Sequence, residues 1–198
     1  MADDKSGRDK QARDEDRRQR EREIAAELER GDEAEPPVDT AELAYFETAL
    51  DDVTFPATGA AIVAAVGDRE IESAVGTYAV ADLVPDVEAE TFDSPAAVRV
   101  RIQRPTVAAA MKRIVEASDP LSDEELGESQ REAYVRTFRA LEGIDGDDDE
   151  GIAFMADWIV ERIREKEALP GSRDVRRRAA KFCRTNGYEV RDDEWLGV

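Results

Sequence analysis

A broad apolar face in the segment IAFMADWIVERIREKEALPG constrains the fold more strongly than any other feature of the sequence. Apolar residues recur there at three- and four-residue steps, which places them on one face of an α-helix. They are Ile152, Met155, Ile159 and Ile163, and Phe154 with Trp158 widens the same face. Because a helix with so wide an apolar face is covered on two sides, the sequence predicts a helical unit in which other segments pack around this one.

A helix is predicted before this segment and another after it. After Ser118-Asp119-Pro120, the pair Ser122 and Glu125 has the spacing of a capping box, which marks a helix start. The apolar stripe of this helix consists of Tyr134, Phe138 and Leu141, with Val135 beside it. The last helix is predicted to begin at a Ser172 cap, after the connector 169–172, and to end at Asn186-Gly187.

Residues 119–198 are therefore predicted to form a three-helix C-terminal domain with an extended tail. In the last helix the side chains of Val175, Ala179 and Phe182 point one way, toward the other helices. The tail YEVRDDEWLGV is expected to pack back onto them through its apolar residues, which are Tyr188, Val190, Trp195 and Leu196.

Residues 40–118 are predicted to form a separate domain that combines helices with a hairpin. Its first helix has a Thr40 cap, and its apolar residues are Leu43, Phe46 and Leu50. The segment AAIVAAVG predicts a short helix ended by Gly67. The segment REIESAVGTYAVADLVPD then predicts a β-hairpin that turns at Gly76 and runs into one helical turn at 81–84.

The end of this domain fits two structures. In TFDSPAAVRVRIQRP, the run Asp93-Ser94-Pro95 is a good helix start, but Val98, Val100 and Ile102 alternate with arginines as in a strand. The start signal favours a helix. Pro105 opens a further helix, whose apolar face consists of Val107, Ala110, Met111 and Ile114. With one hairpin among many helices, the fold class is α+β and mostly helical.

A series of short motifs in this domain resembles a known family. The order is FPATG, a Gly-bounded hydrophobic element, GTYAVADLVPD, TFDSP and RPTVAAAMKRI. It resembles a small-domain family of haloarchaeal proteins of unknown function, over about Leu50 to Ala117. The resemblance implies a compact helix-and-hairpin domain with no assigned activity, so it transfers no catalytic residues.

The charge composition excludes many chemistries and indicates an environment. The chain has no histidine and one cysteine, so an internal disulfide and the usual zinc, haem and Cys/His sites are excluded. The 48 acidic residues outnumber 28 basic ones, of which only five are lysine, giving a formal net charge of −20. This balance resembles proteins of salt-accumulating haloarchaea, in which acidity maintains hydration; a mesophilic acidic protein with a disordered tail is the alternative.

Residues 1–39 are predicted to be a charged N-terminal arm with a linker. No large apolar residue occurs before Ile24, so the arm has nothing to bury, and it is either a solvated helix or disordered. A partner-docking arm that folds on contact is a further possibility for this segment. With no apolar signal core at the start and no run of about 18 apolar residues, we expect a cytoplasmic protein without a membrane span.

The last predicted helix carries a basic stripe, which is the one candidate binding surface. The stripe consists of Arg173, Arg177, Lys181 and Arg184, and Arg176 and Arg178 flank it. One interpretation pairs these cations with nearby acids, in 147–150 and 192–194, within the fold or between subunits. The other is a DNA-recognition helix with YEVRDDEW as a wing. High salt would remove most phosphate affinity, so the intramolecular interpretation is favoured.

Other candidate sites are weaker. DGDDDEG lacks the EF-hand spacing, because Glu150 and Ala156 occupy the positions that need Gly and Glu. Cys183 has no histidine to activate it and is read as a small buried hydrophobe. The prediction is therefore a non-enzymatic cytoplasmic protein that acts through protein contacts or self-association, with the role of an accessory or regulatory subunit. No cofactor, metal, small-molecule ligand or membrane is expected. The alternative is a DNA-binding regulator that uses residues 172–187.

Overall fold

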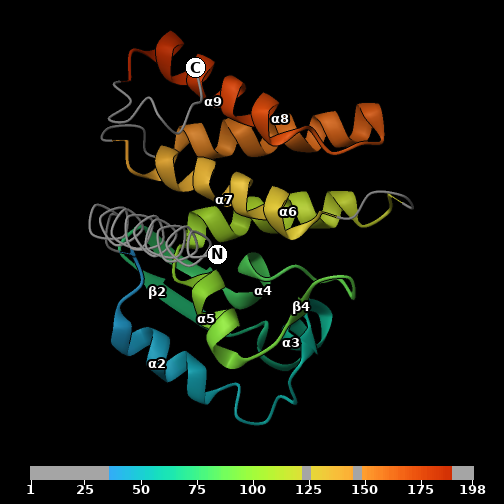
Figure 1. Ribbon diagram of the computed structural model, residues 1–198. Coiled ribbons are helices and arrows are strands. Elements are labelled where there is room, and N and C mark those ends of the chain that lie inside the picture. Colours follow the sequence, from blue (N-terminus) through green and yellow to red (C-terminus); the bar gives the residue numbers. More distant parts are fainter. Residues whose placement is uncertain (1–35, 122–125, 145–148, 189–198) are drawn as a thin grey trace, which may run out of the picture. The chain divides into compact units, whose positions relative to one another are not determined.

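The computed structural model describes residues 36–121, 126–144 and 149–188. In that part of the chain it contains helices α2 to α9 and two antiparallel sheets of two strands each (Figure 1). The predicted fold class, α+β and mostly helical, is confirmed. The N-terminal arm predicted over 1–39 lies largely outside the described residues.

The first described helix, α2 (Thr40–Thr48), has its N-cap one residue earlier than predicted from the start signal. Asp39, not Thr40, is the N-cap, because its side chain accepts a hydrogen bond of 2.7 Å from the backbone N–H of Ala41. The predicted apolar face is confirmed, since Leu43, Phe46 and Leu50 are buried. This helix therefore starts the first hydrophobic cluster.

A two-stranded sheet that the sequence did not predict lies next to the short helix α3 (Gly59–Val66). Strand β1 (Ala57–Thr58) pairs antiparallel with β4 (Thr91–Phe92), and two-residue strands are too short for any periodic signal. Gly59 is required at the start of α3, because a Cβ atom there would lie 2.0 Å from the carbonyl oxygen of Pro85. The glycine of the FPATG motif thus permits close packing of α3 on the segment before β4.

The predicted hairpin and the helical turn after it are present. Strands β2 (Glu70–Ser73) and β3 (Gly76–Ala79) pair antiparallel, and α4 (Val80–Leu83) follows directly. The ambiguous segment is the helix α5 (Pro95–Ile102), with Ser94 as N-cap. A strand would turn Val98, Val100 and Ile102 to one side, but Val98 and Ile102 are buried whereas Val100 is 53% exposed.

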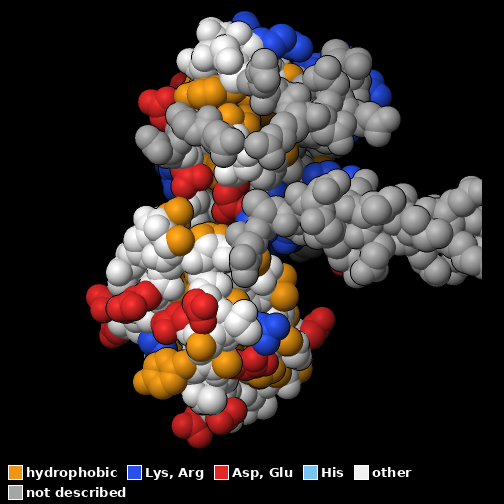
Figure 2. All heavy atoms as spheres, turned by 90° about the vertical axis from the view of Figure 1, so that its left-hand side faces the viewer, with side chains coloured by type: hydrophobic (Ala, Val, Ile, Leu, Met, Phe, Trp, Pro, Cys, Tyr) orange, Lys and Arg blue, Asp and Glu red, His pale blue; other side chains and the backbone are white. Residues whose placement is uncertain are grey.

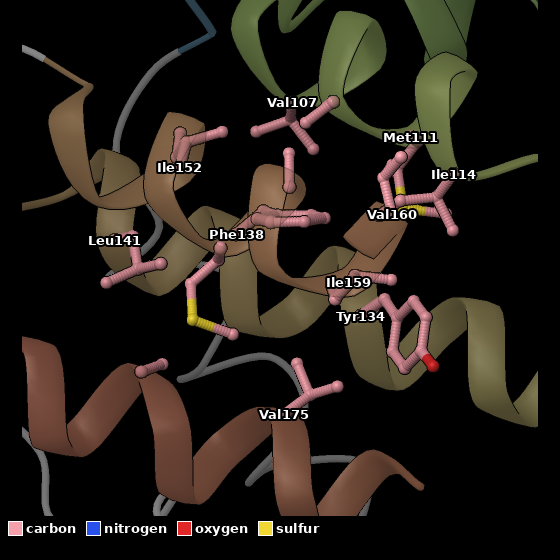
Figure 3. Packing of buried hydrophobic residues seen from close by; sticks show 14 of the residues in the cluster. Val107, Met111, Ile114, Tyr134, Phe138, Leu141, Ile152, Ile159, Val160 and Val175 are labelled. Carbon is pink, nitrogen blue, oxygen red and sulfur yellow. The ribbon is translucent and has the colours of Figure 1, made fainter. Parts of the chain in front are cut away.

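Helix α6 (Pro105–Ser118) contributes to both hydrophobic clusters. Its Ala108 belongs to the cluster built from α2 to α5, whereas its predicted apolar face packs into the cluster of the C-terminal helices (Figure 3). That face consists of Val107, Ala110, Met111 and Ile114. The C-terminal cluster therefore includes α6 in addition to the three helices that the sequence predicted for it.

The three C-terminal helices are α7 (Glu128–Glu142), α8 (Glu150–Lys166) and α9 (Ser172–Asn186). Their predicted apolar faces are buried, including Phe138 of α7 and Ile159 of α8 (Figure 3). Helix α7 begins after Gly127, not after Ser122; Ser122 and Glu125 lie outside the described residues. None of the helices in the described ranges is long and apolar enough to cross a membrane.

Candidate nucleic-acid interface

Helix α9 has one apolar face, and the termini of the helix explain its bounds. Val175, Ala179 and Cys183 are buried against α7 and α8, which confirms the prediction that Cys183 is a small buried hydrophobe. The N-cap is Gly171 rather than the predicted Ser172, so the connector from α8 runs over 167–171. At the other end Gly187 has φ of 75°, which ends the helix at the predicted residue.

The opposite side of α9 is a row of four exposed cations, which we call the basic face. It consists of Arg173, Arg177, Lys181 and Arg184. Steps of four, four and three residues place about one cation on each helical turn, over a length of about 16 Å. In Figure 2, Lys and Arg side chains lie along the upper end of the molecule, where Figure 1 places α9, whereas Asp and Glu side chains are visible on both halves.

The cations of the basic face form no ion pair with any carboxylate of the described residues. Salt bridges within 4 Å occur on α5, α6, α7 and α8, but none of those between described residues includes a side chain of α9. The prediction that these cations pair within the fold is therefore wrong for the described carboxylates, which include Asp149 and Glu150. The other predicted partners, 147–148 and 192–194, lie outside the described residues.

The two flanking arginines differ from the basic face in their environment. Arg176 and Arg178 are half-buried, and the Nε atom of each is buried without a hydrogen-bond partner among described residues. The guanidinium of Arg178 lies 4.8 Å from the ring centroid of Phe154 and 5.9 Å from that of Trp158. Arg178 thus packs on α8, whereas Arg176 remains at the edge of the basic face.

Arg178 is part of an aromatic and arginine stack between α8 and α9, which we call the ladder. The rings of Phe154 and Phe182 stack at 4.8 Å, and the ring of Tyr188 lies 6.0 Å from that of Phe182. At the other end, the Arg162 guanidinium lies 5.8 Å from the Trp158 ring. The periodicity predicted Phe154 and Trp158 on the widened face of α8, but it does not reveal their arginine neighbours, because such pairs depend on how α9 packs.

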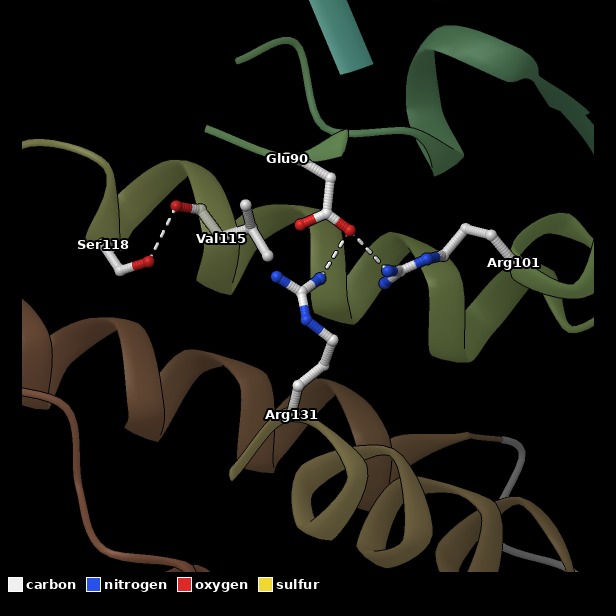
Figure 4. A network of polar contacts seen from close by, with 5 residues as sticks. All are labelled: Glu90, Arg101, Val115, Ser118 and Arg131. Carbon is white, nitrogen blue, oxygen red and sulfur yellow. Dashed lines mark hydrogen bonds and ion pairs between the residues drawn. The ribbon is translucent and has the colours of Figure 1, made fainter. Parts of the chain in front are cut away.

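A second group of arginines, at the junction of α5, α6 and α7, is at least partly buried and paired with carboxylates (Figure 4). Glu90, which is 5% exposed, accepts hydrogen bonds of 2.6 Å from Arg101 and 2.5 Å from Arg131. Arg104 is also buried and pairs with Glu142. Burial lowers the pKa of Arg101 from its ordinary value, while the carboxylate of Glu90 acts in the opposite direction. Sequence analysis did not identify this network.

The acidic loop before α8 has one described residue in a defined contact. Asp149 has a φ of 61° and accepts a hydrogen bond of 2.9 Å from the Thr106 hydroxyl. Positions 145–148 lie outside the described residues. Within the described ranges, no three His, Cys, Asp or Glu side chains converge as metal ligands.

Comparison with known families covers the first half of the fold. Residues 38–114 match a family of unknown function (DUF5789). The predicted resemblance to a family of unknown function is confirmed, and the match extends from before α2 into α6, whereas haloarchaeal origin remains a prediction. Neither a curated protein nor a solved structure matches the chain. The basic face of α9 lies outside the matched residues.

Proposed function

We propose that this protein is a non-enzymatic DNA-binding protein that contacts the phosphate backbone through the basic face of α9. The observation that supports the proposal is the exposure and alignment of the four cations in that face. They are exposed, they follow one helix face turn by turn, and no described carboxylate pairs with them. A cation that pairs with no carboxylate in the described part of the fold is available for an anionic partner.

Three properties of the face favour DNA as that partner. Three of its four cations are arginines, whose planar guanidinium groups bind phosphate with two parallel hydrogen bonds. Its length of about 16 Å suits a helix lying in or across a major groove about 12 Å wide. Helix α9 also follows α8 after a five-residue connector, 167–171, in the order in which a recognition helix follows its partner helix.

The acidity of the remaining surface supports a single orientation on DNA. The chain has a formal net charge of −20, although α9 has six cations and one acid, Asp174. A polyanion is repelled by the acidic surface and attracted to the basic face, so long-range electrostatics would bring the DNA to α9. The composition indicates the cytoplasm of a halophilic archaeon, where high salt removes most of the affinity for phosphate, so in that environment the proposed regulator also needs contacts to base edges or to the shape of the groove.

A second candidate function is a protein contact, and the same charge distribution favours it. A second copy of this chain, or another acidic protein, presents carboxylates that the basic face can pair with. In that case the protein is an accessory subunit or a self-associating protein, as the sequence first indicated. Light scattering as a function of concentration separates the two candidates, because head-to-tail pairing raises the mass in the absence of DNA.

The proposed function is tested by measuring affinity for a fluorescent DNA duplex of about 20 base pairs by anisotropy. The test variant replaces Arg173, Arg177 and Lys181 with glutamine. Three lost phosphate contacts are expected to reduce the affinity at least about a hundredfold at about 0.2 M KCl. Circular dichroism at each salt concentration verifies that both proteins remain folded.

A charge-matched control removes three cations elsewhere. Arg69 lies over the Tyr45 ring at 5.3 Å, Arg99 pairs with Glu47 and Arg113 pairs with Asp157. The variant with glutamine at positions 69, 99 and 113 has the same net charge as the test variant and is expected to retain most DNA affinity. Equal losses in the two variants, or no binding by the unmodified chain, would rule out the proposed interface.

A further inference from the structure

The ladder between α8 and α9 runs beside the basic face and has a defined order. From the C-terminal end of α9 it consists of Tyr188, Phe182, Phe154, Arg178, Trp158 and Arg162. All six side chains are half-buried, so each has an outer edge accessible at the seam between the two helices. Among the described carboxylates, only Glu165 lies at ion-pair distance from either of its two arginines, 3.9 Å from Arg162.

The end of α9 turns the chain back toward this ladder. Gly187 is in the left-handed region, and the N–H of Tyr188 donates a hydrogen bond of 3.0 Å to the carbonyl of Cys183. This is a Schellman motif, in which the residue after the glycine contacts an apolar residue of the last turn. Here the contact is between Tyr188 and Phe182. The chain beyond 188 therefore starts at the first ring of the ladder.

The sequence that follows complements the ladder in length and charge. Residues 189–198 include Asp192, Asp193 and Glu194 and the apolar pair Trp195-Leu196. Ten residues span at most about 33 Å when extended. The ladder residues of α8, from 154 to 162, extend over about 12 Å, so this segment is long enough to follow the ladder to its end. Its three acids would meet the two arginines, and Trp195 would reach the region of Trp158.

We propose that residues 189–198 dock along the ladder, with the acids at 192–194 facing Arg178 and Arg162. Because Arg178 and Lys181 are neighbours on α9, the docked acids also lie at the edge of the basic face. There they compete with phosphate for its cations. The docked segment thus lowers the affinity of the basic face for DNA, a consequence that rests on the proposed function.

Nucleobases fit the ladder less well than this segment does. A base binds a protein aromatic ring through the face of the ring. The Phe154 ring already stacks on Phe182 and has the Arg178 guanidinium 4.8 Å from its centroid, and the Trp158 ring has the guanidinium groups of Arg178 and Arg162 within 6 Å. The rings are thus already used in contacts with each other and with arginines, and the guanidinium groups favour carboxylates.

Docking is tested by the accessibility of Trp195. The chain has two tryptophans, so Trp158→Phe leaves Trp195 as the sole emitter and keeps an aromatic ring in the ladder. We expect quenching by acrylamide to be several-fold weaker in this variant than in the same variant with the substitutions Asp192→Asn, Asp193→Asn and Glu194→Gln. The difference should not depend on protein concentration, because docking occurs within one chain. Equal quenching, or shielding that appears only at high concentration, overturns the proposal.

The effect on DNA is measured with the anisotropy assay in the chain with Trp158 intact. Neutralising the acids at 192–194 is expected to raise DNA affinity about fivefold. Trp195→Ala, which leaves the ladder itself unchanged, should also raise it. The control variant, Asp51→Asn, Asp52→Asn and Asp68→Asn, removes three exposed acids near α2 and α3. It should raise DNA affinity less than the neutralisation of 192–194 does.

The two proposals fail in distinguishable ways. A shielded Trp195 in a protein that binds no DNA would support docking and overturn the proposed function. DNA binding that depends on the basic face, with no difference between the tail variants and the control, would support the proposed function and overturn the inference drawn here.

Discussion

The arginines of this protein occupy two contrasting environments. Arg101 and Arg131 surround one buried carboxylate, Glu90, at the junction of α5 and α7. Arg173 and Arg177 are exposed on α9 and pair with no carboxylate among the described residues. The same side chain is thus a structural element in the first region and an accessible cation in the second.

The comparison shows which charges the fold depends on. Removing one partner of a buried ion pair lowers the stability strongly, because the other charge stays buried without compensation. Removing an exposed cation changes the free energy of unfolding little, because water solvates the cation in both the folded and the unfolded state. Stability should therefore respond to substitutions at the junction, and binding should respond to substitutions on α9.

The largest expected effect is at Glu90. Glu90→Gln keeps the shape of the side chain but leaves two arginines without a negative charge, so we expect a loss of about 3 kcal/mol in unfolding free energy. Glu88→Gln is the control, since Glu88 is an exposed acid two residues away, and its effect should stay within about 0.5 kcal/mol. Urea unfolding measures both. Similar values for the two variants would contradict the structural role assigned to Glu90.

A smaller effect is expected within α9 itself. Arg178→Gln removes the guanidinium that packs on Phe154 and Trp158, which should cost about 1 kcal/mol. Arg177→Gln, at the adjacent exposed position, should leave the stability nearly unchanged. Thermal or urea unfolding of the two variants compares a packed with an exposed arginine on one helix. A reversed order would show that the ladder contributes nothing.

Glu142 pairs with Arg104, but we expect it to contribute little to stability at neutral pH. Burial raises its pKa above the ordinary value of 4.5, and pairing with Arg104 only partly opposes this. The folded state therefore binds this proton more tightly, so the contribution of Glu142 to stability is present at low pH and is lost as pH rises through its raised pKa. We expect Glu142→Gln to cost less than about 1 kcal/mol at pH 7.

The pH dependence of unfolding tests whether the protonation of Glu142 stabilises the fold. As pH falls from neutral toward 4.5, the unmodified chain should gain stability relative to Glu142→Gln, whose side chain has no proton to bind. Urea unfolding of both proteins at several pH values gives the difference. A relative loss of stability by the unmodified chain on acidification would mean that the ion pair with Arg104 outweighs burial.

The smallest change in stability is expected for substitutions in the basic face, and it should be a gain and not a loss. Arg173, Arg177 and Lys181 are like charges four residues apart, which repel each other by about 0.2–0.5 kcal/mol per pair. Their joint replacement by glutamine should leave stability unchanged or raise it by about 0.5 kcal/mol at low salt. Destabilisation by this variant would mean that the cations do pair within the fold.

Much of the fold could be predicted because the helices have strong periodic and start signals. The Ser94-Pro95 start correctly decided α5 against an alternating pattern, since capping depends on neighbouring residues only. Strands β1 and β4 could not be predicted, because strands of two residues have no periodic signal and their pairing joins segments more than 30 residues apart. The apolar face of α9 was predicted correctly, but the predicted pairing of its cations with Asp149 and Glu150 does not occur, because ion pairs depend on tertiary distances that the sequence does not give.

The salt dependence of DNA binding tests the central claim most directly. If the four cations of the basic face each neutralise one phosphate, a plot of log affinity against log KCl concentration should have a slope of about −3.6. Glutamine at 173, 177 and 181 should reduce the slope to about −0.9, with the fold intact. The same slope for both proteins would contradict the account, because the exposed cations of α9 would then not be the ones that contact DNA.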